Sequence, residues 1–285
     1  MKNITVINIE MCIVFILFDP YNIVGPYKFI LAANRDEYYS RLSKPADFWF
    51  HDSIISGLDL QTKNADGTWL GMNRLGKISA ITNYLQPTEN PNATSRGYLV
   101  SNYLTSEVDS YEYLLDVSRN GHLYNGFNII TASLGNGPDK LCYYSNRSNS
   151  PPKELTQGIY GISNSLLDVP WTKLTYGKKK FTDIVTSKYC SPDKLTASLL
   201  ELLNDTTPVP IDPAIEIQGK EFIRPILKEF SAVCVKAKGY GSRTNTVIIV
   251  DSDYNVSFTE RTMLDTEAKE WKTSNFIFSI DIKKQ

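Results

Sequence analysis

A cysteine near the start of the chain is the first residue that could carry covalent chemistry. Cys12 opens an apolar stretch over residues 12–18, and a turn-rich segment leads to a second apolar stretch over residues 27–33. If the two stretches pair as a hairpin, the thiol lies near Arg35 and Asp36. A guanidinium favours the thiolate and a carboxylate orients a proton carrier, which predicts a nucleophile site. A buried core cysteine beside a solvated turn has the same spacing, so spacing alone leaves both interpretations open.

Histidine is too scarce for most other catalytic centres. The chain has two, His51 and His122, and neither has a cysteine, a histidine or an acid at metal-ligand spacing. A Ser-His-Asp triad needs one of them as its base, and no G-x-S-x-G string is present. We therefore expect no metal site and no hydrolase of the serine-triad type.

The composition excludes several classes of partner. The 285 residues carry 30 Lys and Arg against 31 Asp and Glu, a net charge of −1, which gives no basic field to hold nucleic acid. The four cysteines are widely spaced without a C-x-x-C string, as in a protein with free thiols in a reducing compartment. No apolar run approaches the ~20 residues of a membrane-spanning helix. These features predict a soluble cytoplasmic protein with no transmembrane segment.

The elements that must position these residues are mainly strands. Residues 68–72 and 77–82 predict a hairpin beyond the first one, and helical spacing predicts helices over 95–105 and 111–119. Ser191-Pro192-Asp193 is the start signature of another helix. Further strands are expected at 127–134, 140–144, 158–162, 232–235, 246–250, 256–261 and 276–280. Strands that do not alternate strictly with helices favour an α+β fold of two stacked antiparallel sheets with helices outside, in one domain.

Seven short strings of sequence together favour the interpretation of Cys12 as a nucleophile over that of a buried core cysteine. In this order they resemble the NRDE family, also called the transport and Golgi organization protein 2 family, from Met11 nearly to the C-terminus. The strings are Met11-Cys12-Ile13-Val14-Phe15, Ala33-Asn34-Arg35-Asp36-Glu37, Gly67-Thr68-Trp69-Leu70-Gly71, Ser95-Arg96-Gly97, Tyr124-Asn125-Gly126-Phe127-Asn128, Tyr160-Gly161-Ile162-Ser163-Asn164-Ser165 and Arg243-Thr244-Asn245-Thr246. The resemblance implies a four-layer αββα sandwich of the N-terminal nucleophile hydrolase kind, which agrees with the order of elements.

The resemblance also implies roles for individual residues. In that fold a first-residue cysteine gives its thiol proton to its own α-amine, so no histidine is needed. By more distant similarity to cysteine amidases such as penicillin V and bile-salt acylases, Cys12 would be the nucleophile and Asp36 would hold it and its amine. Asn83 and Asn164 would lie near the developing oxyanion, and Arg243 would support the site electrostatically.

Two departures from those amidases keep alternatives open. The amidases carry an R-N-x-D string, whereas Arg35 here follows the asparagine, so its role is not given by the comparison. Met11 and ten further residues precede Cys12, and an amide nitrogen in mid-chain is not a base. Either synthesis begins at Met11, or residues 1–11 are an extension removed from a single domain of residues 12–285, or the protein is not a hydrolase.

Two functions follow as expectations. The first is a cysteine hydrolase that acts on an amide or thioester acyl bond of a small acyl or amphipathic molecule and requires no cofactor. The second is a non-enzymatic carrier of haem or lipid, with haem as cargo. The resemblance implies roles in Golgi organisation, protein secretion, lipid homeostasis and haem trafficking, with peripheral association with the Golgi or mitochondria.

Overall fold

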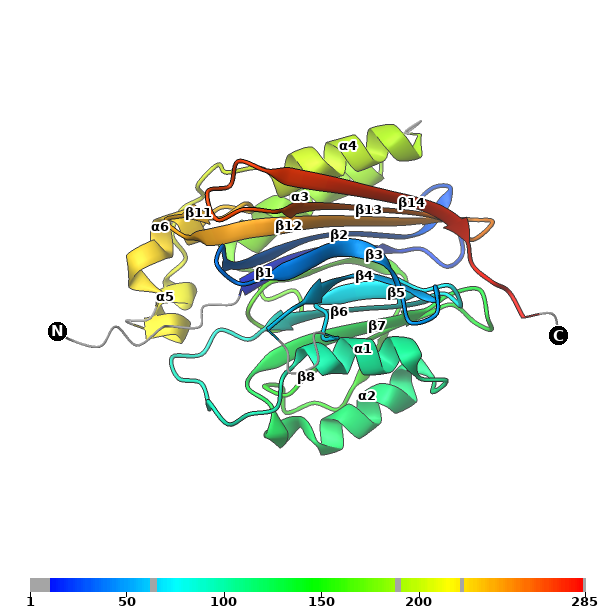
Figure 1. Cartoon of the computed structure of the whole chain (residues 1–285), viewed down its shortest axis with the longest axis horizontal. Helices are drawn as coiled ribbons and strands as arrows, with labels where there is room; N and C mark the ends of the chain where they lie inside the picture. The colour runs from blue at the N-terminus through cyan, green and yellow to red at the C-terminus, as the bar shows by residue number, and fades with distance from the viewer. Residues whose placement is uncertain (1–10, 62–65, 188–190, 221–222, 284–285) are drawn as a thin grey trace.

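Two seven-stranded antiparallel sheets lie face to face in the computed structural model, which describes residues 11–61, 66–187, 191–220 and 223–283. Helices cover the outer face of each sheet, so the layers run helix, sheet, sheet, helix (Figure 1). The predicted α+β fold with an αββα sandwich is therefore confirmed. None of the helices in these ranges is long and apolar enough to cross a membrane.

The first sheet brings together strands from both ends of the chain. Its order is β10-β1-β2-β12-β13-β14, with the short β11 pairing with β12. The strands are β1 (Met11–Phe18), β2 (Tyr27–Tyr38), β10 (Gly158–Ile162), β11 (Lys236–Ala237), β12 (Tyr240–Asp251), β13 (Asn255–Met263) and β14 (Trp271–Ser279). The predicted hairpin of β1 and β2 lies near the centre of this sheet, and so does the cysteine that opens it.

The second sheet is a simple meander in chain order from β3 to β9. Its strands are β3 (Ser43–Trp49), β4 (Ile54–Asp59), β5 (Leu70–Asn73), β6 (Lys77–Asn83), β7 (Phe127–Ser133), β8 (Lys140–Ser145) and β9 (Lys153–Leu155). The predicted hairpin of residues 68–72 and 77–82 forms β5 and β6. Short turns can join antiparallel strands, as they do between β3 and β4 and between β5 and β6, whereas residues 84–126 lie between β6 and β7.

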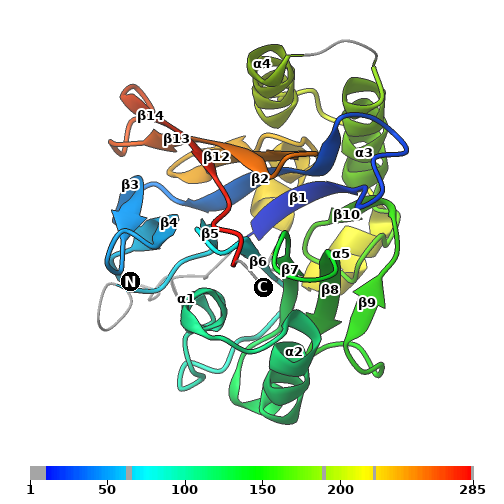
Figure 2. The same cartoon turned by 90° about the vertical axis from the view of Figure 1, so that its right-hand side faces the viewer.

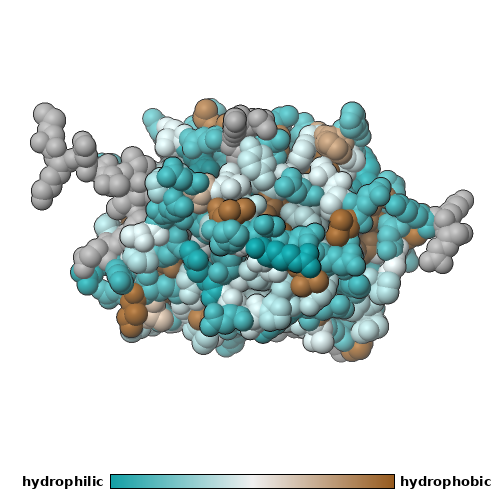
Figure 3. Space-filling view, turned by 90° about the horizontal axis from the view of Figure 1, so that it is seen from below, coloured by the Kyte–Doolittle hydropathy of each residue, from teal (hydrophilic) through white to brown (hydrophobic). Residues whose placement is uncertain are grey.

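Each sheet has its own helical cover (Figures 1 and 2). The helices α1 (Gly97–Thr105) and α2 (Ser110–Arg119) lie on the second sheet, and α3 (Thr172–Val185) and α4 (Pro192–Leu203) lie on the first. Two shorter helices, α5 (Pro213–Gly219) and α6 (Leu227–Phe230), precede β11. Seen from the side of α1 and α2, the surface is mainly hydrophilic with separate hydrophobic spots (Figure 3). This pattern is typical of helices whose apolar stripe faces inward.

Strand β1 is buried on both faces, which explains why its sequence is almost continuously apolar. Val14 and Ile16 belong to the core that contains residues of the second sheet, whereas Ile13 and Phe15 belong to the core under α3 and α4. Alternation along a strand assigns Cys12 to the same face as Val14, toward the second sheet.

Two predictions at the level of elements have clear outcomes. Ser191 caps α4, with Pro192 in its first turn, as predicted. The strand predicted over residues 232–235 is wrong, because this segment forms turns between α6 and β11. Its backbone amides bind elsewhere: the amide of Cys234 donates to the carbonyl of Asp205, and that of Val235 to the hydroxyl of Ser242. Apolar residues are buried there without a ladder partner.

The predicted set of free thiols is only partly covered by the structure. Cys12, Cys142 and Cys234 form no disulfide within the described residues, and Cys142 and Cys234 are buried. Cys190 lies outside those residues, as do residues 1–10 of the predicted N-terminal extension.

Candidate active site

The pairing of β1 with β2 determines which side chains surround Cys12. Cys12 lies opposite Arg35, and Met11 lies opposite Asp36. Directly opposed residues of antiparallel strands share a face of the sheet. The Arg35 side chain therefore lies on the Cys12 face, toward the second sheet, whereas Asp36 lies on the face covered by α3 and α4.

A cavity of about 650 Å³ opens at this end of the sandwich. The first sheet contributes Cys12 and three successive residues of β2, and the second sheet contributes residues of β6 and of the segment before β5. Segments 87–91 and 93–97 form the remaining wall together with Arg41, Asp59 and Asn125. Side chains that line the cavity include Cys12, Arg35, Asp36, Glu37, Trp69, Ile81, Asn83, Glu89 and Arg96. Cys12, Arg35, Asp36 and Asn83 are four of the six predicted site residues.

Asp36 is a buried carboxyl group, and one of its two oxygens accepts a hydrogen bond. Its Oδ1 accepts a hydrogen bond of 2.5 Å from the Ser242 hydroxyl, and its Oδ2 has no partner among the described residues. Burial raises the pKa of Asp36 to about 6, although the positive charge of Lys173 and the Ser242 hydrogen bond act to lower it. At neutral pH this carboxyl is mainly ionised and able to accept a second hydrogen bond.

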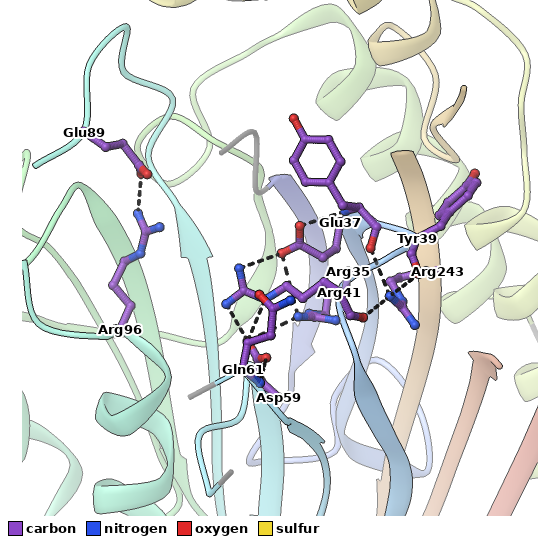
Figure 4. A network of polar contacts seen from close by, with 10 residues as sticks. Arg35, Glu37, Tyr39, Arg41, Asp59, Gln61, Glu89, Arg96 and Arg243 are labelled. Carbon is purple, nitrogen blue, oxygen red and sulfur yellow. Dashed lines mark hydrogen bonds and ion pairs between the residues drawn. The ribbon is translucent and has the colours of Figure 1, made fainter. Parts of the chain in front are cut away.

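Arg35 is fixed in the cavity wall by the charges shown in Figure 4 and, in addition, by an aromatic ring. Its guanidinium lies 4.2 Å from the centre of the Trp69 ring, and its Nη2 is 3.4 Å from Asp59 Oδ2 and 3.8 Å from Glu37 Oε2. Arg41 contacts the same acids, at 2.7 Å from Asp59 and 3.4 Å from Glu37. The position of Arg35 is therefore set before any ligand binds, and it places a cation beside Cys12.

A second charged pair lies across the cavity from this network (Figure 4). Arg96 Nη1 is 3.1 Å from Glu89 Oε1 and donates a further hydrogen bond of 3.1 Å to the carbonyl of Gly126. The cavity thus has guanidinium and carboxylate groups on two opposite walls. Such walls suit a ligand with polar groups at more than one point.

The two predicted asparagines occupy different positions. Asn83 ends β6 and lines the cavity. Asn164 is completely buried and does not line it; its Nδ2 donates to the backbone carbonyl of Asn83 at 2.8 Å, and its own carbonyl accepts from the amide of Leu85 at 2.7 Å. Asn164 therefore holds the end of β6 in place from behind, while Asn83 is the one with access to a ligand.

Arg243, also predicted for the site, is bound to backbone carbonyls and does not line the cavity. The register between β2 and β12 shifts between Ser242 and Thr244, so Arg243 is the additional residue of a β-bulge. Its Nη1 donates to the carbonyls of Tyr38, Tyr39 and Arg41. Burial lowers the pKa of Arg243 to about 10, with a further contribution from the charge of Arg35. Arg243 thus holds the turn after β2 that carries Arg41.

Sequence reasoning missed a lysine on the helix side of the site. Lys173 of α3 is 1% exposed, and its charge acts on Asp36. A lysine beside a polar stretch is usually a surface residue, so the sequence alone gives no signal for it. Within the described ranges, no group of three or more His, Cys, Asp or Glu side chains is placed to hold a metal ion.

Comparison with known proteins places these residues in a family context. The sequence matches the family model described as Transport and Golgi organisation 2 over residues 11–265. The Transport and Golgi organization 2 homolog of Mus musculus is 51% identical over 274 residues, covering 95% of this chain and 99% of its own. The Homo sapiens homolog is 50% identical with the same coverage. The Transport and Golgi organization protein 2 of Drosophila melanogaster is 28% identical over 277 residues, covering 93% of this chain and 97% of its own.

Two solved structures also align with the chain. One is a Caenorhabditis elegans ortholog of N-acylethanolamine-hydrolyzing acid amidase, with a TM-score of 0.47 and 12% identity over 84% of this chain and 92% of its own. The other is a mutant conjugated bile acid hydrolase from Clostridium perfringens, with a TM-score of 0.39 and 11% identity over 96% of this chain and 99% of its own.

Proposed function

The chain belongs to the Transport and Golgi organisation 2 family, and from this membership and the cavity at Cys12 we propose that it is a cysteine acyl hydrolase. The nucleophile is Cys12, acting as the first residue of the mature chain. The substrate is a small molecule with an amide or thioester acyl bond, and the reaction uses no cofactor.

One observation carries this proposal. Cys12 and Arg35 are paired on adjacent strands and line the same cavity, and Asp36 lines it beside them. A guanidinium next to a thiol favours the thiolate, and the unpartnered Oδ2 of Asp36 can accept a hydrogen bond from the amine of Cys12. A cysteine retained only for packing requires none of these groups.

The geometry supports a two-step acyl transfer. The Cys12 thiol proton passes to the α-amine, and the sulfur attacks the acyl carbon to form a thioester. The carbon–nitrogen or carbon–sulfur bond of the substrate breaks, and the leaving group takes the proton from the amine. A water molecule then gives a proton to the amine and its hydroxide to the thioester, which releases the carboxylic acid and restores the thiol. Asn83 is the cavity residue proposed to donate to the oxyanion of both steps.

The cellular role is part of the same proposal. The relatives are named for transport and Golgi organisation, and we extend the hydrolase to acyl chemistry that serves Golgi organisation, secretion and lipid homeostasis. A protein at the cytoplasmic side of the Golgi or mitochondria, held there peripherally, fits this role.

The test combines intact mass with covalent labelling. Protein from its native host should begin at Cys12, and an acylating probe such as an alkyl β-lactone should add once to the wild type. Cys12→Ala should abolish the adduct, because the nucleophile is removed. Cys142→Ser is the matched control and should label as the wild type does, since that thiol is buried in the second sheet.

Two results would contradict the hydrolase. One is a native protein that retains residues 1–11 and labels equally with and without Cys12. The other is a saturable change in the haem absorption spectrum with no turnover of any amide or thioester, which would favour the carrier function.

A further inference from the structure

Lys173 is a buried cation that packing alone does not explain. It lies in the first turn of α3 and is 1% exposed. Its Nζ lies 4.0 Å from the centre of the Phe230 ring and makes no hydrogen bond to any described residue. An ammonium group removed from water without acceptors is costly, so a nearby negative charge must compensate for it.

The titratable groups around Lys173 come from several elements. Asp36 of β2, Cys234 before β11 and Cys12 of β1 all lie close enough for their charges to raise the pKa of Lys173. Tyr39, after β2, belongs to the same cluster, because its pKa is raised by burial and also by the charges of Cys234 and Asp36. Burial raises the pKa of Cys234 to about 11, so this thiol is neutral at pH 7. Asp36 is therefore the anion that balances Lys173.

Lys173 and Asp36 are nevertheless not in direct contact. No ion pair within 4.0 Å joins them in the described part of the chain, and both Lys173 Nζ and Asp36 Oδ2 are without hydrogen-bond partners there. The register places Met11 opposite Asp36, so cleavage before Cys12 creates the new α-amine beside this carboxyl. An amine at that position meets an acceptor in Asp36 and a positive charge in Lys173.

We propose that Lys173 is a positioning residue that keeps the Cys12 terminus in its reactive form, which has a neutral α-amine and a thiolate. The ammonium group of Lys173 disfavours a second positive charge at the α-amine and favours the negative charge of the thiolate. This role rests on the proposed hydrolase. Asp36 orients the amine, and Lys173 offsets the effect of that carboxylate, which alone would hold the amine protonated. The pair thus gives the terminus an acceptor without giving it a net negative environment.

The charges of the pair are both present in a defined pH window. Burial lowers the pKa of Lys173 to about 8 and raises that of Asp36 to about 6. Between these values the carboxyl is ionised and the ammonium is still protonated. The ordinary α-amine pKa of ~7.7 to 8.0 would leave most termini protonated at pH 7. A nearby cation lowers the pKa of the α-amine, so that a larger fraction of it is neutral in the same pH window.

The experiment measures the rate of Cys12 alkylation by iodoacetamide against pH, read by peptide mass spectrometry. It uses the 285-residue chain and the form that begins at Cys12. That form is a fair sample, because it lacks only Met11 of the described strands and both cores begin at residue 13 or later. In Lys173→Met the midpoint should rise by about one pH unit, because the positive charge is lost while the length of the side chain is kept.

Two variants separate charge from packing. Lys173→Arg keeps the positive charge and should restore a midpoint near that of the wild type. Lys178→Met removes a half-buried lysine of the same helix, whose Nζ is 2.7 Å from Asp168, and should leave the midpoint unchanged. A merely structural role for Lys173 predicts lower stability in Lys173→Met without any change in midpoint.

The outcomes separate this inference from the hydrolase itself. If Cys12 of the wild type is no more reactive than Cys142 and Cys234 in either form, the proposed function fails. If Cys12 is selectively reactive and Lys173→Met leaves its midpoint in place, only the role of Lys173 fails. Should Lys173→Met not fold, the pH dependence of α-amine modification in the wild type that begins at Cys12 decides. A midpoint below ~7.7 supports the role, and one at or above ~7.7 overturns it.

Discussion

Four successive polar residues of β2 are almost fully buried. Because side chains alternate along a strand, two of them face the helices and two face the second sheet. Asn34 and Asp36 face the helices, where Asn34 Nδ2 donates 2.8 Å to the carbonyl of Leu203. Arg35 and Glu37 face the second sheet and line the cavity, which Asp36 also reaches. One string therefore supplies both the support of the site and its wall, because the period of a strand is two residues.

At the residue scale, Arg243→Met should lower the free energy of unfolding by about 2–4 kcal/mol. The guanidinium donates to three carbonyls around the turn after β2. Methionine would take this donor from the carbonyls of Tyr39 and Arg41, whereas the Tyr38 carbonyl keeps the amide of Arg41. Urea unfolding monitored by circular dichroism measures this difference. Arg147→Met is the control, because Arg147 is exposed and its change should stay within about 0.5 kcal/mol. Equal stability of the two variants would contradict the structural role of Arg243.

At the element scale, the close approach of α3 to β1 depends on a glycine. A Cβ at Gly177 would lie 2.4 Å from Phe15 Cζ and 3.1 Å from Val233 Cγ2. Phe15 is completely buried and stacks on Phe181 with ring centres 5.7 Å apart, so it has little room to move. The same helix carries Lys173, and its distance from the sheet therefore sets where that ammonium lies.

Gly177→Ala tests this contact. Helix propensity alone would favour alanine by ~1 kcal/mol, but overlap in a well-packed core costs about 1–3 kcal/mol. We expect a net loss of up to about 2 kcal/mol in thermal or urea unfolding. Gly25→Ala is the matched control, because no atom lies within 4 Å of its added Cβ, and it should be close to neutral. A stabilised Gly177→Ala would show that α3 can move away from β1 without cost.

At the scale of the whole molecule, a buried acid connects the two sheets. Glu260 of β13 is 1% exposed, and its Oε1 accepts 2.7 Å hydrogen bonds from the Ala46 amide of β3 and from the Thr262 hydroxyl. Burial raises the pKa of Glu260 to about 7, against these hydrogen bonds and the charge of Arg35, which lower it. The contact between the sheets therefore includes a group that titrates near neutral pH.

This acid predicts how stability depends on pH. The pKa of Glu260 is higher in the folded protein than its ordinary value of 4.5. When the side chain is protonated in both the folded and the unfolded state, it does not change the free energy of unfolding. As pH rises from 4.5 through 7, it ionises more readily in the unfolded state, and the fold is destabilised. Glu260→Gln keeps the acceptor oxygen and cannot ionise. Over this range its free energy of unfolding should rise relative to the wild type by about 3 kcal/mol.

Urea unfolding at pH 5 and pH 7.5 measures the effect. Glu216→Gln is the control, because Glu216 is 43% exposed and pairs with Arg224 on the surface. It should leave the pH dependence as it is in the wild type. Parallel pH curves for Glu260→Gln and the wild type would mean that the pKa of Glu260 is the same in the folded and the unfolded protein.

Local patterns in the sequence were enough for the layers and for part of the site. The apolar run after Cys12, the cap at Ser191 and the grouping of strands predict elements that the structure contains, because these signals depend on neighbours in the chain. Helix α3 escaped prediction, since its buried face includes Lys173 and Gly177 in place of apolar residues. The strand expected over residues 232–235 failed for the opposite reason: its apolar side chains are buried by packing without a partner strand.

Sequence patterns alone predicted the two-sheet architecture, the family and the pairing of Cys12 with a segment that contains Arg35 and Asp36. The three-dimensional fold was needed to tell which predicted residues line the cavity and which support it. Asn83 lines it, whereas Asn164 and Arg243 bind backbone carbonyls behind it. The fold also brought Lys173 to the site from a distant helix. Burial and charge at a site depend on residues that are distant in the sequence and close in space, and local spacing in the sequence does not encode that proximity.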